Sequence, residues 1–431
     1  MRITLIGTGF VGVVSAAVYA SFGHTIMGLD VDEKKIQLLQ QSIVPFFEPN
    51  LTELLKEQQL AGNLQFTTDY SVAIPKSEVV IIAVGTPSAP DGQADLKYVL
   101  AAARSLAPFI SPGTIVAIKS TVPPGTLEKV SQEISKLTQV NFSCASLPEF
   151  LREGSAVHDT LNPDRIVIGA TDEETFTVLE RLHQPFKAPI IKVKPESAQM
   201  GKYAANSYLA TRITFINQIA DLCDKNGANV QEVIQIIGQD QRIGTHYWYP
   251  GLGYGGSCFP KDVKELAAYS RAVGESTNLF NKVSELNEQR MAKLFNQFSD
   301  QVGGFSNKKV AVLGLSFKPF TDDLREAPAT KLIPMLLKAG AQVLSFDPMA
   351  HYEPASMETG SYSQVDSIEE AVSPAQVVFN LVEWAQLISF DYGSLKYKQT
   401  ERWFIDARNQ FDPIQLTEIG FKYIGIGRSA C

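Results

Sequence analysis

One cysteine lies in a segment whose composition is typical of a reactive thiol. Residues 251–262 read GLGYGGSCFPKD, which places Cys258 between glycines and the charged pair Lys261 and Asp262. Glycine tolerates positive φ and lets the backbone approach a ligand closely. A nearby cation favours the thiolate, which is the nucleophilic form of cysteine. A buried apolar cysteine is the usual alternative, but this context favours a nucleophile at Cys258.

The other cysteines lack such a context. We expect Cys144 and Cys223 in the core and Cys431 in the tail. No CxxC pair is present, so the sequence predicts neither a metal site nor a disulfide framework, and a reducing compartment fits.

A glycine motif near the N-terminus predicts a dinucleotide site. Residues 7–12 read GTGFVG, after a strand-like run and before a helical one. Gly7 permits the tight turn, and Gly9 lets the backbone approach a pyrophosphate. Gly12 lets the helix and the strand pack closely. Phosphates would bind at the helix N-terminus, beside Phe10 and Val11. The alternative is a glycine turn without a nucleotide.

An acidic residue after the second strand identifies the expected cofactor. Asp30 can accept hydrogen bonds from the ribose hydroxyls and would repel a 2′-phosphate, so we predict NAD rather than NADP. Lys35 is included among the predicted cofactor residues, although a solvated helix face is the more common role for such a lysine.

The elements around these motifs predict an α/β protein. Continuous apolar runs indicate parallel strands that are buried on both faces by helices, as in a doubly wound sheet. The first such runs are Ile3–Ile6, Thr25–Leu29, Val79–Val84, Thr114–Ile118 and Ile166–Ile168. A second set is Lys309–Leu313, Gln342–Phe346, Val377–Val382, Trp403–Ile405 and Tyr423–Ile426.

A long helix is predicted between the two sets of strands. Residues 197–226 contain no proline and carry apolar residues at helical spacing, and Gly227 is a plausible stop. The periodic positions are Tyr203, Ser207, Ala210, Phe215, Ile219 and Leu222. The predicted division is residues 1–196, a central helical region at 197–298, and residues 299–431.

The second α/β region is expected to bind a different ligand. Its first turn, Gly314-Leu315-Ser316-Phe317-Lys318, lacks the three-glycine spacing. We therefore expect the substrate's nucleotide there rather than a second dinucleotide.

Charge and hydropathy exclude several classes of partner. The net charge is −8 and the pI about 5.3, which argues against nucleic acid and against an anionic membrane surface. No apolar run is long enough to span a bilayer, and no secretion signal is recognised. A cytoplasmic location is predicted.

Further motifs together carry a resemblance to the UDP-glucose/GDP-mannose dehydrogenase family. They follow the family's order over nearly the whole chain. Besides GTGFVG and GYGGSCFPKD they are VGTP (84–87), STVPPGT (120–126), PEFLREGSA (148–156), NPDRIVIG (162–169), ESAQMGKYAANSYLA (196–210), GQDQRIG (238–244), GLSFKPFTDDLREAP (314–328) and DARNQFD (406–412). The resemblance implies two Rossmann-like domains joined by a long central helix, a homodimer, and a small-molecule nucleotide sugar as substrate.

The resemblance also implies a reaction. The family oxidises a sugar alcohol twice with two NAD. The expected substrate here is UDP-glucose, and its oxidation at C6 would give UDP-glucuronate. Cys258 would add to the aldehyde to give a thiohemiacetal, because an aldehyde carries no leaving hydride until a nucleophile adds. The second oxidation gives a thioester, which water hydrolyses.

Catalytic roles follow by position in the family's motifs. Lys202 and Asn206 would stabilise an oxyanion, Asp262 and Thr121 would position water, and Glu149 would be the base with Glu153 in support. From spacing alone, a solvated stripe explains Lys202 and Asn206, and an exposed helix edge explains the two glutamates.

Binding roles follow in the same way. Arg242 would reach the partner subunit's substrate, because a guanidinium grips phosphate with two hydrogen bonds. The other implied substrate residues are Glu149, Phe150, Leu151, Lys202, Asn206, Tyr247, Tyr249, Gly251, Gly255, Cys258, Phe317, Lys318 and Arg408. The further implied cofactor residues are Thr86, Pro87, Thr121, Glu153, Lys261 and Arg325. Ordinary surface charge remains an alternative for Lys318 and Arg408.

Two positions depart from the family's pattern. Leu147 stands where Asn is usual, and Phe320 where Asp is usual. Leu147 puts the hydrogen bonding near Glu149 in doubt, and Phe320 alters a contact near the substrate region.

Other functions stay open at this point. UDP-N-acetylmannosamine, UDP-N-acetylglucosamine and GDP-mannose are alternative substrates. A non-catalytic binding protein on the same fold, or a two-electron dehydrogenase that stops at the aldehyde or ketone, would not need Cys258.

Overall fold

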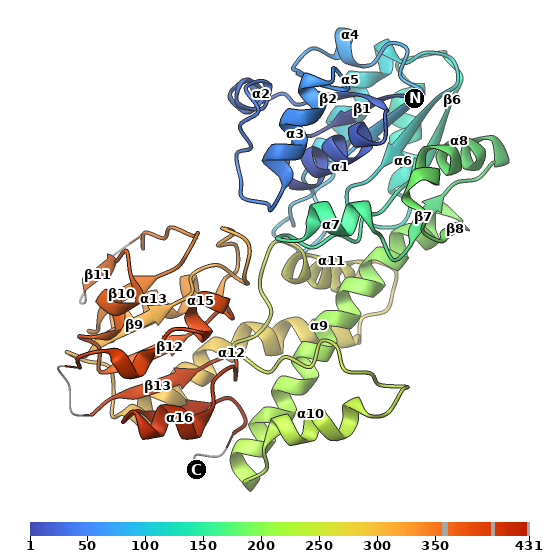
Figure 1. Cartoon of the computed structure of the whole chain (residues 1–431). Coiled ribbons are helices and arrows are strands. Elements are labelled where there is room, and N and C mark those ends of the chain that lie inside the picture. Colours follow the sequence, from blue (N-terminus) through green and yellow to red (C-terminus); the bar gives the residue numbers. More distant parts are fainter. Residues whose placement is uncertain (356–360, 398–400, 429–431) are drawn as a thin grey trace. The chain divides into compact units, whose positions relative to one another are not determined.

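The computed structural model describes residues 1–355, 361–397 and 401–428 (Figure 1). Contacts divide the chain into two compact units. The first unit comprises Met1–Ala205 and Lys264–Ser276, and the second comprises Asn206–Val263 and Thr277–Cys431. Two of the three unit boundaries fall inside helices, α9 (Pro195–Asn226) and α11 (Phe259–Ala272). Each unit is described by itself.

The first unit contains an eight-stranded sheet in the order β3-β2-β1-β4-β5-β6-β7-β8. Its first six positions have the strand order of a dinucleotide-binding fold, with the switch point between β1 and β4. The strands are β1 Arg2–Ile6, β2 Thr25–Leu29, β3 Leu64–Thr67, β4 Val79–Ile82, β5 Thr114–Ile118, β6 Phe142–Ser146, β7 Ile166–Gly169 and β8 Ile190–Val193.

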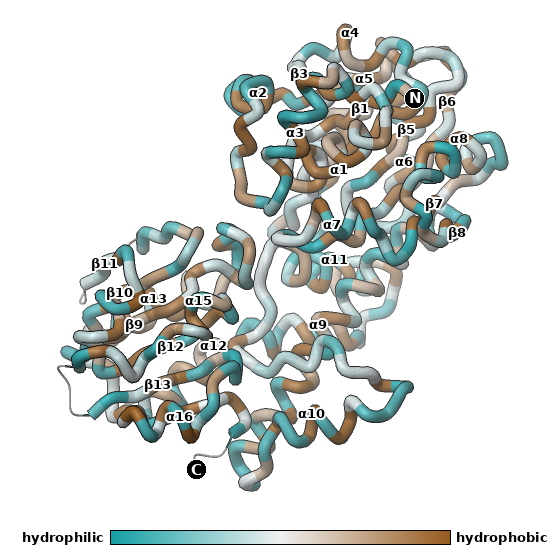
Figure 2. Tube along the Cα trace, viewed as in Figure 1, coloured by the Kyte–Doolittle hydropathy of each residue, from teal (hydrophilic) through white to brown (hydrophobic). Residues whose placement is uncertain are grey.

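Continuous apolar runs in these strands supply two cores, one on each face of the sheet. In β4, Val79 and Ile81 belong to one buried cluster, while Val80 and Ile82 belong to another. Successive side chains of a strand point to opposite faces, so an uninterrupted apolar run fits a strand covered on both sides. Hydrophobic residues are concentrated on the strands in Figure 2.

Helices cover both faces of this sheet. The first cluster includes residues of α1, α3 and α8, and the second includes residues of α5 and α6. The helices of the first unit are α1 Phe10–Ser21, α2 Glu33–Gln40, α3 Leu51–Leu60, α4 Tyr70–Ala73, α5 Lys97–Leu106, α6 Thr126–Ser135, α7 Ala156–Leu161 and α8 Glu173–His183, with short 3-10 helices at Ala107–Phe109 and Gln184–Phe186.

The second unit contains a six-stranded parallel sheet in the order β11-β10-β9-β12-β13-β14. This repeats the order of the first sheet, with the switch point between β9 and β12. The strands are β9 Lys309–Leu313, β10 Gln342–Phe346, β11 Ser361–Gln364, β12 Val377–Asn380, β13 Trp403–Asp406 and β14 Lys422–Gly425. Its further helices are α10 Val230–Gly238, α12 Leu279–Val302, α13 Pro328–Lys338, α14 Ile368–Val372, α15 Ala385–Ile388 and α16 Pro413–Glu418, with a 3-10 helix at Tyr392–Ser394.

The architecture confirms the predicted fold class: two doubly wound α/β regions and a long helix at 195–226. The expectation of a fully parallel first sheet is wrong at one point, because β6 and β7 pair antiparallel through Ser146 and Gly169. No helix of the described residues is both long and apolar enough to cross a membrane.

Candidate functional site

The glycine motif forms the turn between β1 and α1 as predicted. Gly7 has φ +99°, and a Cβ there would lie 2.6 Å from the Ala83 carbonyl oxygen. A Cβ on Gly12 would lie 1.8 Å from the Gly7 oxygen, whereas a Cβ on Gly9 would meet no atom within 4 Å. Gly9 therefore leaves open space at the N-terminus of α1, where Phe10 and Val11 begin the helix. Free amides at such a terminus suit a pyrophosphate.

Asp30 follows β2 and faces this turn. Its Oδ2 accepts hydrogen bonds from the Thr8 amide at 2.8 Å and the Thr8 hydroxyl at 2.9 Å. Lys35 Nζ lies 3.3 Å from the same oxygen, so Lys35 takes part in this cluster rather than only in a solvated face. Burial raises the pKa of Asp30, but these hydrogen bonds and the Lys35 charge outweigh it, and the net pKa is lowered. An ionised Asp30 fits the ribose hydroxyls of NAD.

A hydrogen bond connects the loops that follow β4 and β5, next to the switch point between β1 and β4. Thr86 is buried and its hydroxyl donates to the Thr121 carbonyl oxygen at 2.9 Å. Pro87 is exposed next to it. Ser88 donates to Glu265 of α11 at 3.3 Å, and the sequence analysis missed Glu265. The carboxyl ends of β4 and β5 therefore present Thr86, Pro87 and Thr121 on the edge of the sheet where a dinucleotide is expected.

Glu149 and Lys202 form a buried ion pair. Lys202 Nζ lies 2.8 Å from Glu149 Oε1, with side chains 5% and 9% exposed. Glu149 Oε2 accepts the Leu151 amide at 2.7 Å, and the Lys202 ammonium lies 5.5 Å from the Phe150 ring centroid. The alternatives of an exposed helix edge for Glu149 and a solvated stripe for Lys202 are wrong, because the chain buries both groups together.

A second lysine lies near this pair. Lys119 directly follows β5 and is 9% exposed. Burial lowers the pKa of Lys119 to about 8, although Glu149 raises it, and the Lys202 charge lowers it further. Lys119 was not predicted from the sequence; its only sequence signal is a lysine directly after the strand TIVAI.

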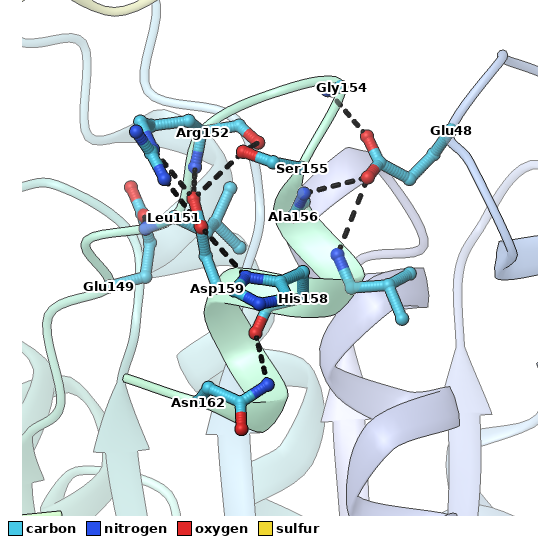
Figure 3. Close-up of polar contacts among 11 residues, drawn as sticks. Glu48, Glu149, Leu151, Arg152, Gly154, Ser155, Ala156, His158, Asp159 and Asn162 are labelled. Carbon is cyan, nitrogen blue, oxygen red and sulfur yellow. Dashed lines mark hydrogen bonds and ion pairs between the residues drawn. The ribbon is translucent and has the colours of Figure 1, made fainter. Parts of the chain in front are cut away.

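The buried carboxylate of Glu48 anchors the segment between Glu149 and α7 (Figure 3). Glu48 accepts the Gly154 amide at 2.6 Å and the Ala156 amide at 2.7 Å. Arg152 binds Asp159 in the same segment, with Nη2 to Oδ1 at 2.8 Å. These contacts fix the backbone that carries Phe150, Leu151 and Glu153. Glu48 was also missed, because its partners are backbone amides about a hundred residues away.

In the second unit, Cys258 occupies the position before α11. It is exposed, and its carbonyl accepts the Asp262 amide at 2.8 Å as the first bond of the helix. A helix N-terminus stabilises a thiolate through its partial positive charge. Cys223 is buried as predicted, whereas Cys144 is only half-buried by side-chain exposure, although burial raises its thiol pKa to about 12. Cys431 lies outside the described residues.

Asp262 is fully buried one turn into α11. Its Oδ2 accepts Asn206 Nδ2 at 2.6 Å, and its Oδ1 lies 2.7 Å from Lys261 Nζ. The predicted residues Asn206, Lys261 and Asp262 therefore form one cluster. Two of them, Lys261 and Asp262, follow Cys258 closely in the chain. Lys261 contacts this cluster, while its expected contact with the cofactor stays a prediction.

The carboxyl ends of β9 and β13 carry the predicted substrate residues Phe317 and Arg408. Arg408 Nη2 donates to the Phe317 carbonyl at 3.3 Å, and a Cβ on Gly251 would lie 3.5 Å from Arg408 Nη1. A Cβ on Gly255 would lie 3.5 Å from the Phe317 Cβ. Lys318 Nζ lies 5.5 Å from the Phe317 ring. The fold brings these residues together at the switch point of the second sheet.

Other predicted residues lie apart from this group or face solvent. Arg242 is exposed and pairs with Asp240 at 2.6 Å, and Arg325 pairs with Asp323 at 2.7 Å. The rings of Tyr247 and Tyr249 lie 5.7 Å apart.

The two departures from the family pattern have different surroundings. Leu147 is 3% exposed and packs in the core of the first unit. Phe320 has φ +62°, is 55% exposed, and contacts Trp384 edge-on at 5.5 Å. A phenylalanine in the left-handed region is strained, whereas the family's usual Asp tolerates that conformation better.

A carboxylate closes the first turn of the second sheet. Asp347 Oδ2 accepts the Leu315 amide at 2.6 Å and the Ser316 amide at 3.2 Å. The next helix, α13, starts only at Pro328, so no helix N-terminus follows Gly314 directly. This geometry supports the expectation that the turn does not bind a second dinucleotide. Within the described ranges, no group of three acidic, His or Cys side chains is arranged to hold a metal ion.

The fold and these residues define a dinucleotide-binding protein, because a doubly wound sheet presents an open glycine turn beside Asp30, whose pKa is lowered. Sequence comparison gives its family. The chain matches the UDP-glucose/GDP-mannose dehydrogenase family in its NAD binding domain over residues 1–187, its central domain over 196–289 and its UDP binding domain over 311–413. The chain belongs to this family of nucleotide-sugar dehydrogenases.

Similar proteins include named relatives and a solved structure. UDP-glucose 6-dehydrogenase TuaD of Bacillus subtilis is 39% identical over 431 residues, covering 100% of this chain and 94% of that protein. UDP-glucose 6-dehydrogenase of Rhizobium meliloti is 40% identical, and the match covers 99% of this chain and 100% of that protein. A UDP-glucose dehydrogenase structure from Pyrobaculum islandicum has a TM-score of 0.88 at 34% identity, with 99% and 98% covered.

The Asp30 cluster predicts how cofactor affinity responds to substitution. Asp30→Ala should raise the Kd for NAD about 10- to 100-fold, since a hydrogen bond to a charged group contributes about 1.5–3 kcal/mol. It should also weaken the preference over NADP. Titration of each cofactor by calorimetry measures this. Asp32→Ala is the matched control, because Asp32 caps α2; an unchanged Kd in Asp30→Ala would contradict the assignment.

Proposed function

We propose that this enzyme oxidises UDP-glucose at C6 to UDP-glucuronate with two NAD, through a thioester on Cys258. The observation that carries the proposal is the exposed Cys258 thiol at the N-terminus of α11. Relatives about 40% identical over the full chain are UDP-glucose 6-dehydrogenases, which supports this substrate.

The proposed chemistry proceeds through four changes at C6. When bound, NAD accepts the hydride in each of the two oxidations. The first oxidation removes a hydride and the hydroxyl proton and leaves an aldehyde. The Cys258 thiolate then forms a C–S bond to give a thiohemiacetal, whose oxidation gives the thioester. Water cleaves the C–S bond and returns the thiol.

Donors and bases in both units support these steps. We assign Lys202 and Asn206 to the developing oxyanion, since each presents an N–H donor on α9 one turn apart. Glu149 serves as the base for thioester hydrolysis, with Glu153 in support. Asp262 and Thr121 orient the water. The Lys202–Glu149 pair at 2.8 Å links an acid–base group to an oxyanion donor.

The two sheets divide the binding tasks. We assign the NAD site to the first sheet's turn and the loops after β4 and β5, and the UDP site to the ends of β9 and β13. We also propose that the chain has three parts: an NAD-binding domain at residues 1–196, a central helical region at 197–298 and a domain for the UDP sugar at 299–431. The remaining assignments to cofactor are Lys35, Glu153, Lys261 and Arg325. Those to substrate are Phe150, Leu151, Tyr247, Tyr249, Gly251, Gly255, Phe317, Lys318 and Arg408.

A homodimer built on α9 is also proposed. Tyr208, Phe215 and Leu222 are 60%, 52% and 57% exposed and lie seven residues apart, so they form one apolar stripe along the helix. The periodic pattern that predicted this helix therefore contains buried residues, such as Tyr203 and Ala210, and exposed ones, such as Phe215 and Leu222. Arg242, which is exposed, would reach the partner's substrate. A cytoplasmic location fits a reactive thiol; cell fractionation tests it.

A second substrate class has a specific observation in its favour. The structure of a UDP-D-ManNAc dehydrogenase from Pyrococcus horikoshii has a TM-score of 0.86 at 29% identity, with 99% of both chains covered. The higher identity to UDP-glucose 6-dehydrogenases favours UDP-glucose. A non-catalytic protein is not favoured, because Cys258, Lys202, Asn206 and Asp262 are all present.

A substrate panel tests the proposal. With UDP-glucose, the expected yield is about two NADH per sugar, because a thioester pathway carries both oxidations. Turnover with another nucleotide sugar and none with UDP-glucose would overturn the substrate. Cys258→Ser should lose this four-electron oxidation by more than about 1000-fold and still bind NAD, whereas Cys223→Ser is the matched control. Full activity in Cys258→Ser would refute the thioester.

The α9 stripe gives a prediction for assembly. Leu222→Glu should weaken or abolish the dimer, because a charge would be buried in an apolar interface. Light scattering at micromolar concentration measures the mass. Leu60→Glu, at a residue 81% exposed in the first unit, should leave the dimer intact. A wild-type monomer would contradict the proposed dimer.

A further inference from the structure

The glycine-rich segment before Cys258 is fixed by side chains of two helices. The Gly251 amide donates to Asn217 Oδ1 of α9 at 2.8 Å, and the Gly251 carbonyl accepts Arg290 Nε of α12 at 2.6 Å. The Tyr254 amide donates to Asn287 Oδ1 at 2.8 Å, and its carbonyl accepts Asn287 Nδ2 at 3.0 Å. Side chains therefore replace the secondary-structure partners that this backbone lacks.

The position of Asn287 also explains why residue 253 is a glycine. Gly253 has φ +103°, and a Cβ there would lie 2.5 Å from Asn287 Oδ1. Because the amide group fills the space that a side chain would need, the backbone at 253 passes directly over Asn287. Asn287 and Arg290 are three apart on α12, so they share one face of that helix.

Arg290 is itself immobilised by a buried charge. It is 3% exposed, and its Nη1 lies 2.8 Å from Asp221 Oδ1. Lys293 Nζ lies 2.6 Å from the other oxygen, Asp221 Oδ2. Removing one member of a buried ion pair is strongly destabilising. These contacts hold the guanidinium with its Nε directed at the Gly251 carbonyl.

The other side of the segment is equally confined. The Gly256 amide donates to the Arg325 carbonyl at 3.0 Å. A Cβ on Gly255 would lie 2.3 Å from the Glu326 carbonyl oxygen, and a Cβ on Gly256 would lie 2.8 Å from the Phe317 ring. The segment thus lies between α12 and the loop that carries Phe317. Cys258 follows two residues later, at the start of α11.

We propose that Asn287 and Arg290 are positioning residues that hold the Cys258 thiol at the N-terminus of α11. No contact between either side chain and the sulfur carries this proposal; both act through the backbone at Gly251 and Tyr254. The inference rests on the proposed nucleophilic role of Cys258. If the segment shifts, the thiol leaves the electrostatic field that favours the thiolate and the approach geometry that addition to a carbonyl requires.

Two substitutions weaken the contacts while keeping the side-chain size. Asn287→Asp retains an acceptor for the Tyr254 amide but removes the donor to the Tyr254 carbonyl. Arg290→Lys retains the charge beside Asp221 but lacks the planar fork that reaches both Asp221 and Gly251. Lys293→Gln is the matched control, because Lys293 pairs with the same Asp221 and is exposed.

The readout is the reactivity of the thiol itself. Iodoacetamide alkylation of Cys258 is followed by mass spectrometry of its peptide, from about pH 6 to about pH 9, across the usual range of reactive thiols. Mass spectrometry distinguishes the Cys258 peptide from those of Cys144 and Cys223, and burial raises the thiol pKa of those two cysteines. NADH formation gives kcat and KM for each substrate, and thermal melting reports folding.

We expect Asn287→Asp and Arg290→Lys to lower kcat about 10- to 100-fold and to slow alkylation with a higher pH midpoint, because small misplacements have effects of that size. The KM for NAD should stay within about twofold, since neither Asn287 nor Arg290 is among the residues that we assign to the cofactor. Lys293→Gln should resemble the wild type in every measurement.

Unchanged alkylation in the folded Asn287→Asp variant would overturn the proposal, and so would an equal loss in Lys293→Gln. If Arg290→Lys does not fold, Asn287→Asp decides alone. Failure of the proposed function is distinguishable: Cys258→Ser would then keep its activity, while alkylation of Cys258 would still respond to Asn287→Asp.

Discussion

The N-terminus of α11 is the constraint on which the proposed chemistry depends. A thiol is a weak nucleophile at its ordinary pKa, and a helix N-terminus favours its ionised form. Cys258 takes this position only because the preceding glycines follow a path that most side chains would block. Gly253 and Gly256 have positive φ, and Gly255 lies against the Glu326 carbonyl. The glycines therefore serve the placement of the cysteine as much as the approach of a ligand.

The two sheets use a carboxylate after the second strand in different ways. Asp30 accepts two hydrogen bonds from Thr8, in a turn where Gly9 leaves open space before α1. Asp347 follows β10 and accepts the amides of Leu315 and Ser316, and no helix begins there. The same strand order therefore gives one end that fits a dinucleotide and another that fits a different ligand, consistent with the NAD and UDP binding domains of the family.

The sequence predicted the buried strands and the turn motifs because these features are local. The apolar runs at Thr25–Leu29 and Thr114–Ile118 match β2 and β5. The sequence did not predict β3, β6, β8 and β11. Of these, β6 and β11 read FSCAS and SYSQ, and such polar strands need the neighbouring strand to define them. The antiparallel pairing of β6 and β7 depends on tertiary contacts.

Within the site, motifs predicted the residues to which we assign the chemistry but not those that support them. Glu48, Asn287 and Arg290 bind backbone amides or carbonyls far away in the chain, and nothing in their local sequence marks that role. The sequence gives only one indication for Lys119, which is that it directly follows the buried strand β5. Burial of the Glu149–Lys202 pair also depends on tertiary packing, which explains why spacing alone favoured solvated surfaces for both.

The most direct test of the central claim is to observe the sulfur–sugar bond. Glu149→Gln should retain both oxidations and lose the base for hydrolysis, so the thioester should accumulate. Mass spectrometry of this variant, quenched with acid after mixing with UDP-glucose and NAD, should find a UDP-glucuronoyl group on the peptide that contains Cys258. NADH formation in the burst without any adduct on Cys258 would contradict the account.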